Sequence, residues 1–243
     1  IVANPSDSNF DGCVQLNDLL DLLSAYGDCG VEESPWQCGD PLEYQGYDYE
    51  TVQIGEQCWF AENCKYLPSV SLSNLGSETE PHYYVYDYDG TDVEAAQATS
   101  NYGTYGVLYN WPAIMVGDIC RSGWHIPSDE EVSQLADFLG GESVAGGKMK
   151  EVGYNHWNFP NDGATNSSGW TGLPGGERNT STDAFDEYGN SGNWWSSSDH
   201  DDGSELNPSS SWRFALDLNN DNLDRSHLNK AYGFSVRCIK DAE

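Results

Sequence analysis

Side chains that carry oxygen recur at fixed intervals in the segment Asp7–Asp18. A calcium loop of about twelve residues needs oxygen ligands at its positions 1, 3, 5, 7, 9 and 12 and a sharp turn at position 6. Gly12 occupies the turn position. Every ligand position holds a residue that can supply an oxygen, the cysteine through its backbone carbonyl: Asp7, Asn9, Asp11, Cys13, Gln15 and Asp18. The segment is therefore predicted to bind calcium.

The loop must be positioned by the helix that follows it. Five leucines lie on one face of a helix that is expected to run to about Tyr26 and to end at Gly27: Leu16, Leu19, Leu20, Leu22 and Leu23. A loop followed by a single helix, with Asp at the closing position, resembles one half of a dockerin repeat. Dockerins dock through two such repeats, so the single copy in residues 1–30 is interpreted as a calcium-stapled connector.

A module of about 30 residues cannot bury a sufficient core, so metal and a disulfide are expected to hold it together. Cys13 and Cys29 flank the helix and are the natural pair. The leucine stripe would aggregate if it stayed exposed, and it is expected to contact a neighbouring domain or subunit.

Composition excludes several functional classes. Ten Lys and Arg against 40 Asp and Glu give a net charge of -30, which repels nucleic acid and anionic membranes. No stretch approaches 18 consecutive apolar residues, so membrane insertion is not expected. Seven cysteines without metal-binding spacing indicate disulfides and an oxidising, extracellular location.

Residues 31–45 are interpreted as a linker to a main domain over residues 46–243. In this domain, residues 50–54 and 58–62 form a predicted hairpin around Gly55 and Glu56. A helix is predicted from Ser128, which forms a capping box with Glu131, to Leu139. Alternating apolar residues over 212–218 and 234–238 predict strands of a sheet with one buried face.

The cysteines of the main domain leave one odd thiol. Cys120 and Cys238 would tie the helix to the sheet, a closure that contributes about 3–5 kcal/mol. An extended chain from Cys58 to Cys64 spans about 20 Å, which exceeds the roughly 7 Å limit for a disulfide. Cys38 therefore pairs with one of these two, or the strand breaks, and the remaining thiol is either buried or intermolecular.

Long stretches of Gly, Asn, Ser and Thr between the predicted elements are interpreted as ordered loops that bind a ligand. The loops 153–193 and 198–229 are expected to present the following ligand-binding side chains: Trp157, Trp170, Trp194, Trp195, Asn219, Asp221, Asn222 and Arg225. The histidines share no ligand spacing, and no nucleophile motif is present. Catalysis is not expected.

Six short segments together resemble the Fibrobacter succinogenes major paralogous domain over about residues 47–241. These are Trp59–Asn63, Tyr105–Ala113, Gly123–Ser128, Gly169–Gly176, Trp194–Ser198 and Gly233–Cys238. The resemblance implies an α+β, C-type-lectin-like domain with antiparallel sheets, one or two helices and long ordered loops. It also implies a bacterial extracellular or cell-surface protein.

Two activities of similar folds are not expected here. Formylglycine-generating enzymes depend on a pair of cysteines near the C-terminus, where this chain has Cys238 alone, and the calcium-and-sugar motifs of C-type lectins are missing. The leading hypothesis is a calcium-binding surface protein whose lectin-like domain binds a glycan or a protein in adhesion. The alternative is a structural subunit of an extracellular filament or layer that assembles through the calcium module.

Overall fold

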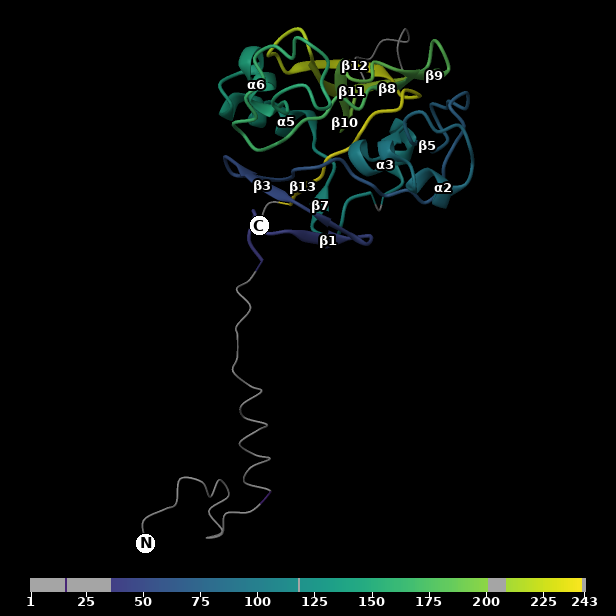
Figure 1. Ribbon diagram of the computed structural model, residues 1–243, viewed down its shortest axis with the longest axis horizontal. Coiled ribbons are helices and arrows are strands. Elements are labelled where there is room, and N and C mark those ends of the chain that lie inside the picture. Colours follow the sequence, from purple (N-terminus) through teal and green to yellow (C-terminus); the bar gives the residue numbers. More distant parts are fainter. Residues whose placement is uncertain (1–15, 17–35, 118, 201–208, 242–243) are drawn as a thin grey trace. The chain divides into compact units, whose positions relative to one another are not determined.

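The computed structural model describes residues 16, 36–117, 119–200 and 209–241. The predicted calcium loop, with its six ligands, and the predicted Cys13–Cys29 pair lie outside these ranges, as does the helix apart from Leu16. Within the described residues, the strands of every sheet pair antiparallel and helices pack beside them (Figure 1). This arrangement confirms the α+β class.

A four-stranded sheet in the order β3-β4-β13-β7 joins the two ends of the domain. Its strands are β3 (Thr51–Ile54), β4 (Gln57–Phe60), β13 (Ile239–Lys240) and β7 (Trp124–His125). The first two form the predicted hairpin around Gly55, whose φ of 61° lies in the left-handed region that glycine adopts most readily. Ile239 pairs with both Trp59 and His125, so the C-terminal strand lies between the hairpin and β7.

The predicted linker 31–45 is wrong for its second half. The strand β1 (Leu42–Tyr44) pairs with β2 (Tyr47–Tyr49), and a disulfide joins Cys38 to Cys58. Burial of Leu42 and the disulfide fix this segment to the domain, and Gly39 lies in the turn that leads into β1.

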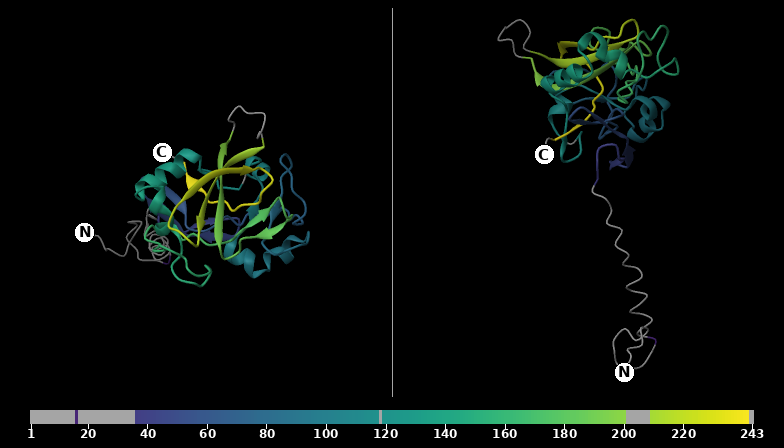
Figure 2. Two further views of the ribbon diagram at one scale, coloured as in Figure 1. Left: turned by 90° about the horizontal axis from the view of Figure 1, so that it is seen from above. Right: turned by 90° about the vertical axis from the view of Figure 1, so that its left-hand side faces the viewer.

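A three-stranded sheet in the order β10-β11-β12 carries the long loops. Its strands are β10 (Ser191–Asp199), β11 (Ser210–Asp217) and β12 (Asp224–Asn229). Figure 2 shows this sheet from above, with helices beside it. Smaller antiparallel pairs complete the domain: β5 (Tyr83–Tyr84) with β6 (Leu108–Tyr109), and β8 (Glu177–Asn179) with β9 (Ala184–Asp186).

The predicted helix is α5 (Asp129–Phe138), and its capping box between Ser128 and Glu131 is confirmed. It packs with α6 (Glu142–Met149) against β10 and β11. The expectation of one or two helices was too low, because the described residues also contain three short helices: α2 (Val93–Gln97), α3 (Ser100–Tyr105) and α4 (Trp111–Met115). Each of these begins at a side-chain cap, from Asp92, Thr99 or Asn110 respectively.

Tryptophan side chains fill the core between the sheets and helices. The four that were expected to present a ligand surface, Trp157, Trp170, Trp194 and Trp195, are each at most 1% exposed, so this prediction is wrong. Trp194 Nε1 donates to Asn63 Oδ1 at 2.8 Å and Trp195 Nε1 to the Tyr109 carbonyl at 2.7 Å. These two bonds remove the cost of burying the polar atoms of Trp194 and Trp195, whereas the Nε1 atom of Trp170 is buried without a hydrogen-bond partner among the described residues.

The segment 233–239 passes through the middle of the domain and is buried on every side. The prediction of a strand with one exposed face is therefore wrong here. Only 1% of the Arg237 surface is exposed, and its guanidinium stacks over the Trp170 ring, with the Cζ atom 3.8 Å from the ring centroid. Burial lowers the pKa of Arg237 to about 9. Its guanidinium donates to Asn63 Oδ1 at 3.0 Å and to the carbonyls of Trp170 and Thr171, so the buried charge is hydrogen-bonded throughout.

Candidate functional site

The sheet β10-β11-β12 has one apolar face and one polar face. Successive side chains of a strand point to opposite sides, and Trp194, Phe214 and Leu216 face the core. Asn193 precedes Trp194 in β10, and Ala215 lies between Phe214 and Leu216 in β11. These two residues are paired across the strands and lie on the opposite face. The same alternation that buries the aromatic residues therefore presents a row of polar residues on the other side of the sheet.

A pocket of about 730 Å³ lies over this polar face. Its lining combines five carboxyl groups with two guanidinium groups: Glu142, Glu177, Glu187, Asp217 and Asp224 with Arg213 and Arg225. The remaining polar lining comes from Ser143, Ser191, Asn193, Asn220 and Asn222. No aromatic side chain of the described residues lines it. The pocket brings together parts of both loop regions that were expected to bind a ligand.

Arg213 lies on the polar face at the centre of the pocket wall. Its Nη1 donates to Asn193 Oδ1 at 3.2 Å, and its Nη2 lies 3.0 Å from Asp224 Oδ2. Burial lowers the pKa of Arg213, while the nearby carboxylates of Asp224 and Glu177 raise it. The Nε atom is buried and has no hydrogen-bond partner among the described residues. The guanidinium is thus held in place with part of its donor capacity unused.

Glu177, from β8, is the most buried carboxyl group of the pocket, with 9% of its surface exposed. Its pKa is raised to about 7, chiefly by burial. Arg213 opposes this shift, and the charges of Glu187 and Asp186 add to it. Asn179 Nδ2 donates to Glu177 Oε1 at 3.1 Å. Near neutral pH this side chain therefore exists in both protonation states, and it can donate or accept a hydrogen bond.

Arg225 was expected to contact a ligand, but its donors are already used. It forms two hydrogen bonds with the Asp129 carboxylate, at 3.0 and 2.6 Å, and one with Glu142 Oε1 at 2.6 Å. A further donation goes to Ser133 Oγ at 3.2 Å. Bidentate pairing fixes the planar guanidinium, so Arg225 ties β12 to α5 and α6 and forms the rigid edge of the pocket.

The turn between β11 and β12 closes the pocket and is held from below by Lys150. This side chain is fully buried, and its Nζ donates to the carbonyls of Asp162, Asp217 and Asn220 at 2.7, 2.8 and 2.7 Å. Burial lowers the pKa of Lys150, whereas the nearby aspartates raise it. Three donors directed at three carbonyls satisfy the ammonium completely. The turn is therefore preorganised by a residue that does not line the pocket.

The structure separates the eight predicted ligand-binding residues into three groups. Asn222 and Arg225 line the pocket. Asn219 and Asp221 belong to the same turn but do not line it, and the four tryptophans lie in the core. Sequence reasoning missed Glu177 and Asn193 as site residues. It did place Arg213 in an alternating strand, and an arginine on the polar side of such a strand was the available signal for the site.

Sulfur chemistry is concentrated elsewhere in the domain. Disulfides join Cys38 with Cys58 and Cys120 with Cys238, the latter being the pair expected from the sequence. The odd thiol is Cys64, which is free and buried. Among the described residues, the group of acidic, His and Cys side chains that converges closely enough to hold a metal consists of three sulfurs, those of Cys64, Cys120 and Cys238. The carboxyl groups of the pocket do not converge in this way.

None of the helices in the described ranges is long and apolar enough to cross a membrane. No curated protein and no solved structure matches the chain. The family model of the Fibrobacter succinogenes major domain matches residues 52–240, which include the polar pocket, all three clustered sulfurs and both principal sheets apart from Thr51. The chain belongs to the Fibrobacter succinogenes major domain family.

Proposed function

We propose that this chain is an extracellular binding protein whose main domain holds a hydroxyl-rich ligand, a glycan, in the pocket over β10 and β11. The observation that carries the proposal is that Arg213 and Glu177 line the same preorganised wall. One side chain donates hydrogen bonds, and the other changes between donor and acceptor near neutral pH. Sugar hydroxyl groups are both donors and acceptors, so they match such a wall.

Binding without catalysis fits the wall better than an enzymatic reaction does. Arg213 and Arg225 are held by carboxylates that neutralise them, and Asn193 is oriented by its bond to Arg213. Preorganised polar groups of this kind give specificity at low entropic cost. We therefore assign recognition, and no chemical step, to the pocket.

The proposal includes the arrangement expected from the family. The domain is taken to have a C-type-lectin-like fold, in which long loops on one sheet carry the ligand site. The N-terminal segment 1–30 is taken to be a dockerin-like module that binds calcium through Asp7–Asp18. Two disulfides support an oxidising, extracellular compartment, and the charge of -30 supports a partner that is not an anionic polymer.

A glycan array probed with the full chain tests the pocket, followed by calorimetric titration of the glycans that bind. Ser191 lines the pocket and is partly exposed, so Ser191→Phe places a ring in the cavity. We expect affinity to fall at least about tenfold, the equivalent of about 1.4 kcal/mol. Ser100→Phe, at an exposed position on α3, is the matched control and should leave affinity unchanged.

Repeating the titration with a calcium chelator separates the two modules. Binding in the pocket should survive chelation, because the pocket carboxyl groups do not converge on a metal position. Equal affinities for wild type and Ser191→Phe would contradict the assignment of the pocket. If chelation abolished glycan binding and Ser191→Phe did not change it, the glycan site would be assigned to the N-terminal segment.

A further inference from the structure

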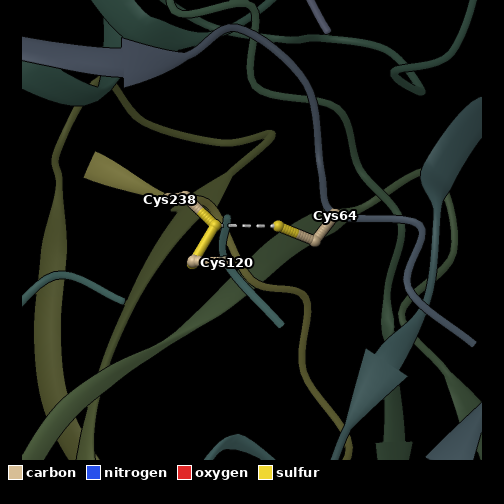
Figure 3. A group of neighbouring side chains, drawn as sticks. All are labelled: Cys64, Cys120 and Cys238. Carbon is tan, nitrogen blue, oxygen red and sulfur yellow. Dashed lines mark hydrogen bonds between the residues drawn. A yellow bond between two sulfur atoms is a disulfide. The ribbon is translucent and has the colours of Figure 1, made fainter. Parts of the chain in front are cut away.

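Three sulfur atoms meet at a point outside the polar pocket. The Cys64 Sγ atom lies 3.3 Å from the Cys238 Sγ atom, which is bonded to Cys120. Figure 3 shows the Cys64 sulfur directed at the Cys238 sulfur, with Cys120 on the other side of the disulfide. All three sulfurs lie within 4.8 Å of one another. A thiol in contact with a disulfide has the composition required for exchange.

The backbone holds Cys64 in this position from two sides. Its amide donates to the Val236 carbonyl at 2.9 Å, and its carbonyl accepts from the Val107 amide at 3.1 Å. Gly106 packs against the same carbonyl so closely that a Cβ atom there would lie 2.6 Å from it. The contact between the thiol and the disulfide is therefore built into the packing of three chain segments.

The three cysteines differ in their exposure to solvent. Cys64 and Cys238 have no exposed surface, whereas Cys120 is partly exposed. Cys120 also lines a separate cavity of about 300 Å³, together with Ile114, Met115 and Ile126. A thiol released at Cys120 would be accessible to a small molecule, while a thiol at either other position would not.

We propose that Cys64 is the resident nucleophile of an internal thiol–disulfide exchange, and that this exchange makes Cys120 a modification site for small thiol-reactive molecules. The Cys64 thiolate attacks the Cys238 sulfur and forms a Cys64–Cys238 disulfide. The Cys120–Cys238 bond breaks, and its electron pair leaves with Cys120 as a thiolate. The proton lost by Cys64 is balanced by the proton gained at Cys120, so the exchange needs no oxidant.

The released thiolate can then react with a low-molecular-weight disulfide. The Cys120 sulfur forms a mixed disulfide with one half of that molecule, and the other half leaves as a thiolate. The apolar lining around Ile114 and Ile126 favours a small, uncharged reagent. This second step traps the exchanged form, because Cys120 can no longer attack the new Cys64–Cys238 bond.

Two features make the exchange slow at neutral pH. Burial raises the pKa of the Cys64 thiol to about 12, although Arg237 and a backbone hydrogen bond from Cys238 oppose this shift. The thiolate fraction therefore rises about tenfold for each pH unit below that value. In addition, the Cys64 sulfur lies 3.3 Å from the Cys238 sulfur and also within 4.8 Å of the Cys120 sulfur, which is too close to both for in-line attack, so a side-chain rotation must precede attack.

The test is alkylation of the native full chain with iodoacetamide under non-reducing conditions, followed by peptide mapping of every cysteine. We expect alkylated Cys120 together with a Cys64–Cys238 cross-linked peptide. The rate should increase by up to about 100-fold between about pH 7 and about pH 9, as thiolate control requires. Alkylation of Cys64 with the Cys120–Cys238 bond intact would overturn the proposal, and so would the absence of any label on Cys120 in the folded protein.

Two variants separate exchange from local opening. Cys64→Ser keeps the Cys120–Cys238 disulfide, and its Cys120 should stay unlabelled over the same period; labelling at the wild-type rate would overturn the proposal. Cys120→Ala removes the leaving sulfur, and dissolved oxygen should oxidise its Cys64 and Cys238 thiols to a disulfide, with the loss of two hydrogens to the oxygen. A persistent free Cys64 in oxidised, folded Cys120→Ala protein would show that the two sulfurs cannot join. Circular dichroism of each variant verifies that the fold is retained.

Discussion

Replacement of Glu177 by Gln should stabilise the protein at neutral and alkaline pH and leave its stability unchanged in acid. The substitution preserves the shape of the side chain and the acceptor for Asn179, but it removes the charge that burial disfavours. In wild type the folded state holds a proton on Glu177 up to a pKa of about 7, while the unfolded chain releases it near the ordinary value of 4.5. Between these values the folded state binds more protons, so the stability of wild type falls as pH rises.

The size of the effect follows from the two pKa values. One pKa unit corresponds to about 1.4 kcal/mol, so raising the pKa from 4.5 to about 7 corresponds to about 3 kcal/mol. The free energy of unfolding of Glu177→Gln minus that of wild type should therefore rise by about 3 kcal/mol between about pH 4 and about pH 8. It should be constant above that range, because both states of wild type are then ionised.

Urea unfolding at a series of pH values, with the disulfides intact, measures this difference. Glu94→Gln is the matched control, because it removes the same charge from an exposed position on α2, far from the pocket. A difference between Glu177→Gln and wild type that does not change with pH would refute the reasoning. So would a rise that is already complete by about pH 5.5, because it would place the folded-state pKa of Glu177 only slightly above its ordinary value.

Three further perturbations test other parts of the molecule. Lys150→Met should lower the free energy of unfolding by about 3 kcal/mol or more in denaturant titrations, because three buried carbonyls lose their donors. It should also weaken glycan binding, because the turn over the pocket loosens. Unchanged stability would contradict this. Burial lowers the pKa of His125, but hydrogen bonds to Asp241 and Glu131 outweigh burial, so the net shift of this pKa is upward. His125→Asn should therefore destabilise the protein below about pH 6.5, with the effect lost as pH rises through the raised pKa, and a difference that grows with pH in thermal unfolding would contradict this sign. Asp11→Ala should abolish calcium binding, measured by calorimetry, and any calcium-dependent self-association, measured by sedimentation. A calcium affinity equal to that of wild type would exclude the predicted loop.

Local patterns predicted the local elements well. The capping box at Ser128 and the apolar stripe of Val132, Leu135 and Ala136 placed α5 to within a residue at each end. The turn at Gly55 placed the first hairpin. Both are determined by interactions over a few residues, and these interactions are directly visible in a sequence. Residues 42–44 were assigned to a linker because their strand partner and the Cys38–Cys58 disulfide involve residues outside that segment.

The sequence by itself determined the class of the domain, its acidic surface, its family segments and the pairing of Cys120 with Cys238. Tertiary structure alone decided which tryptophans are buried, that Glu177 and Arg213 line one pocket, and that Cys64 contacts Cys238. The physical reason is the range of the interactions. Capping, turns and alternation act between near neighbours in the chain, whereas burial and pKa shifts depend on residues that only folding brings together: Cys64 and Cys238 are 174 positions apart, yet their sulfurs lie 3.3 Å from each other.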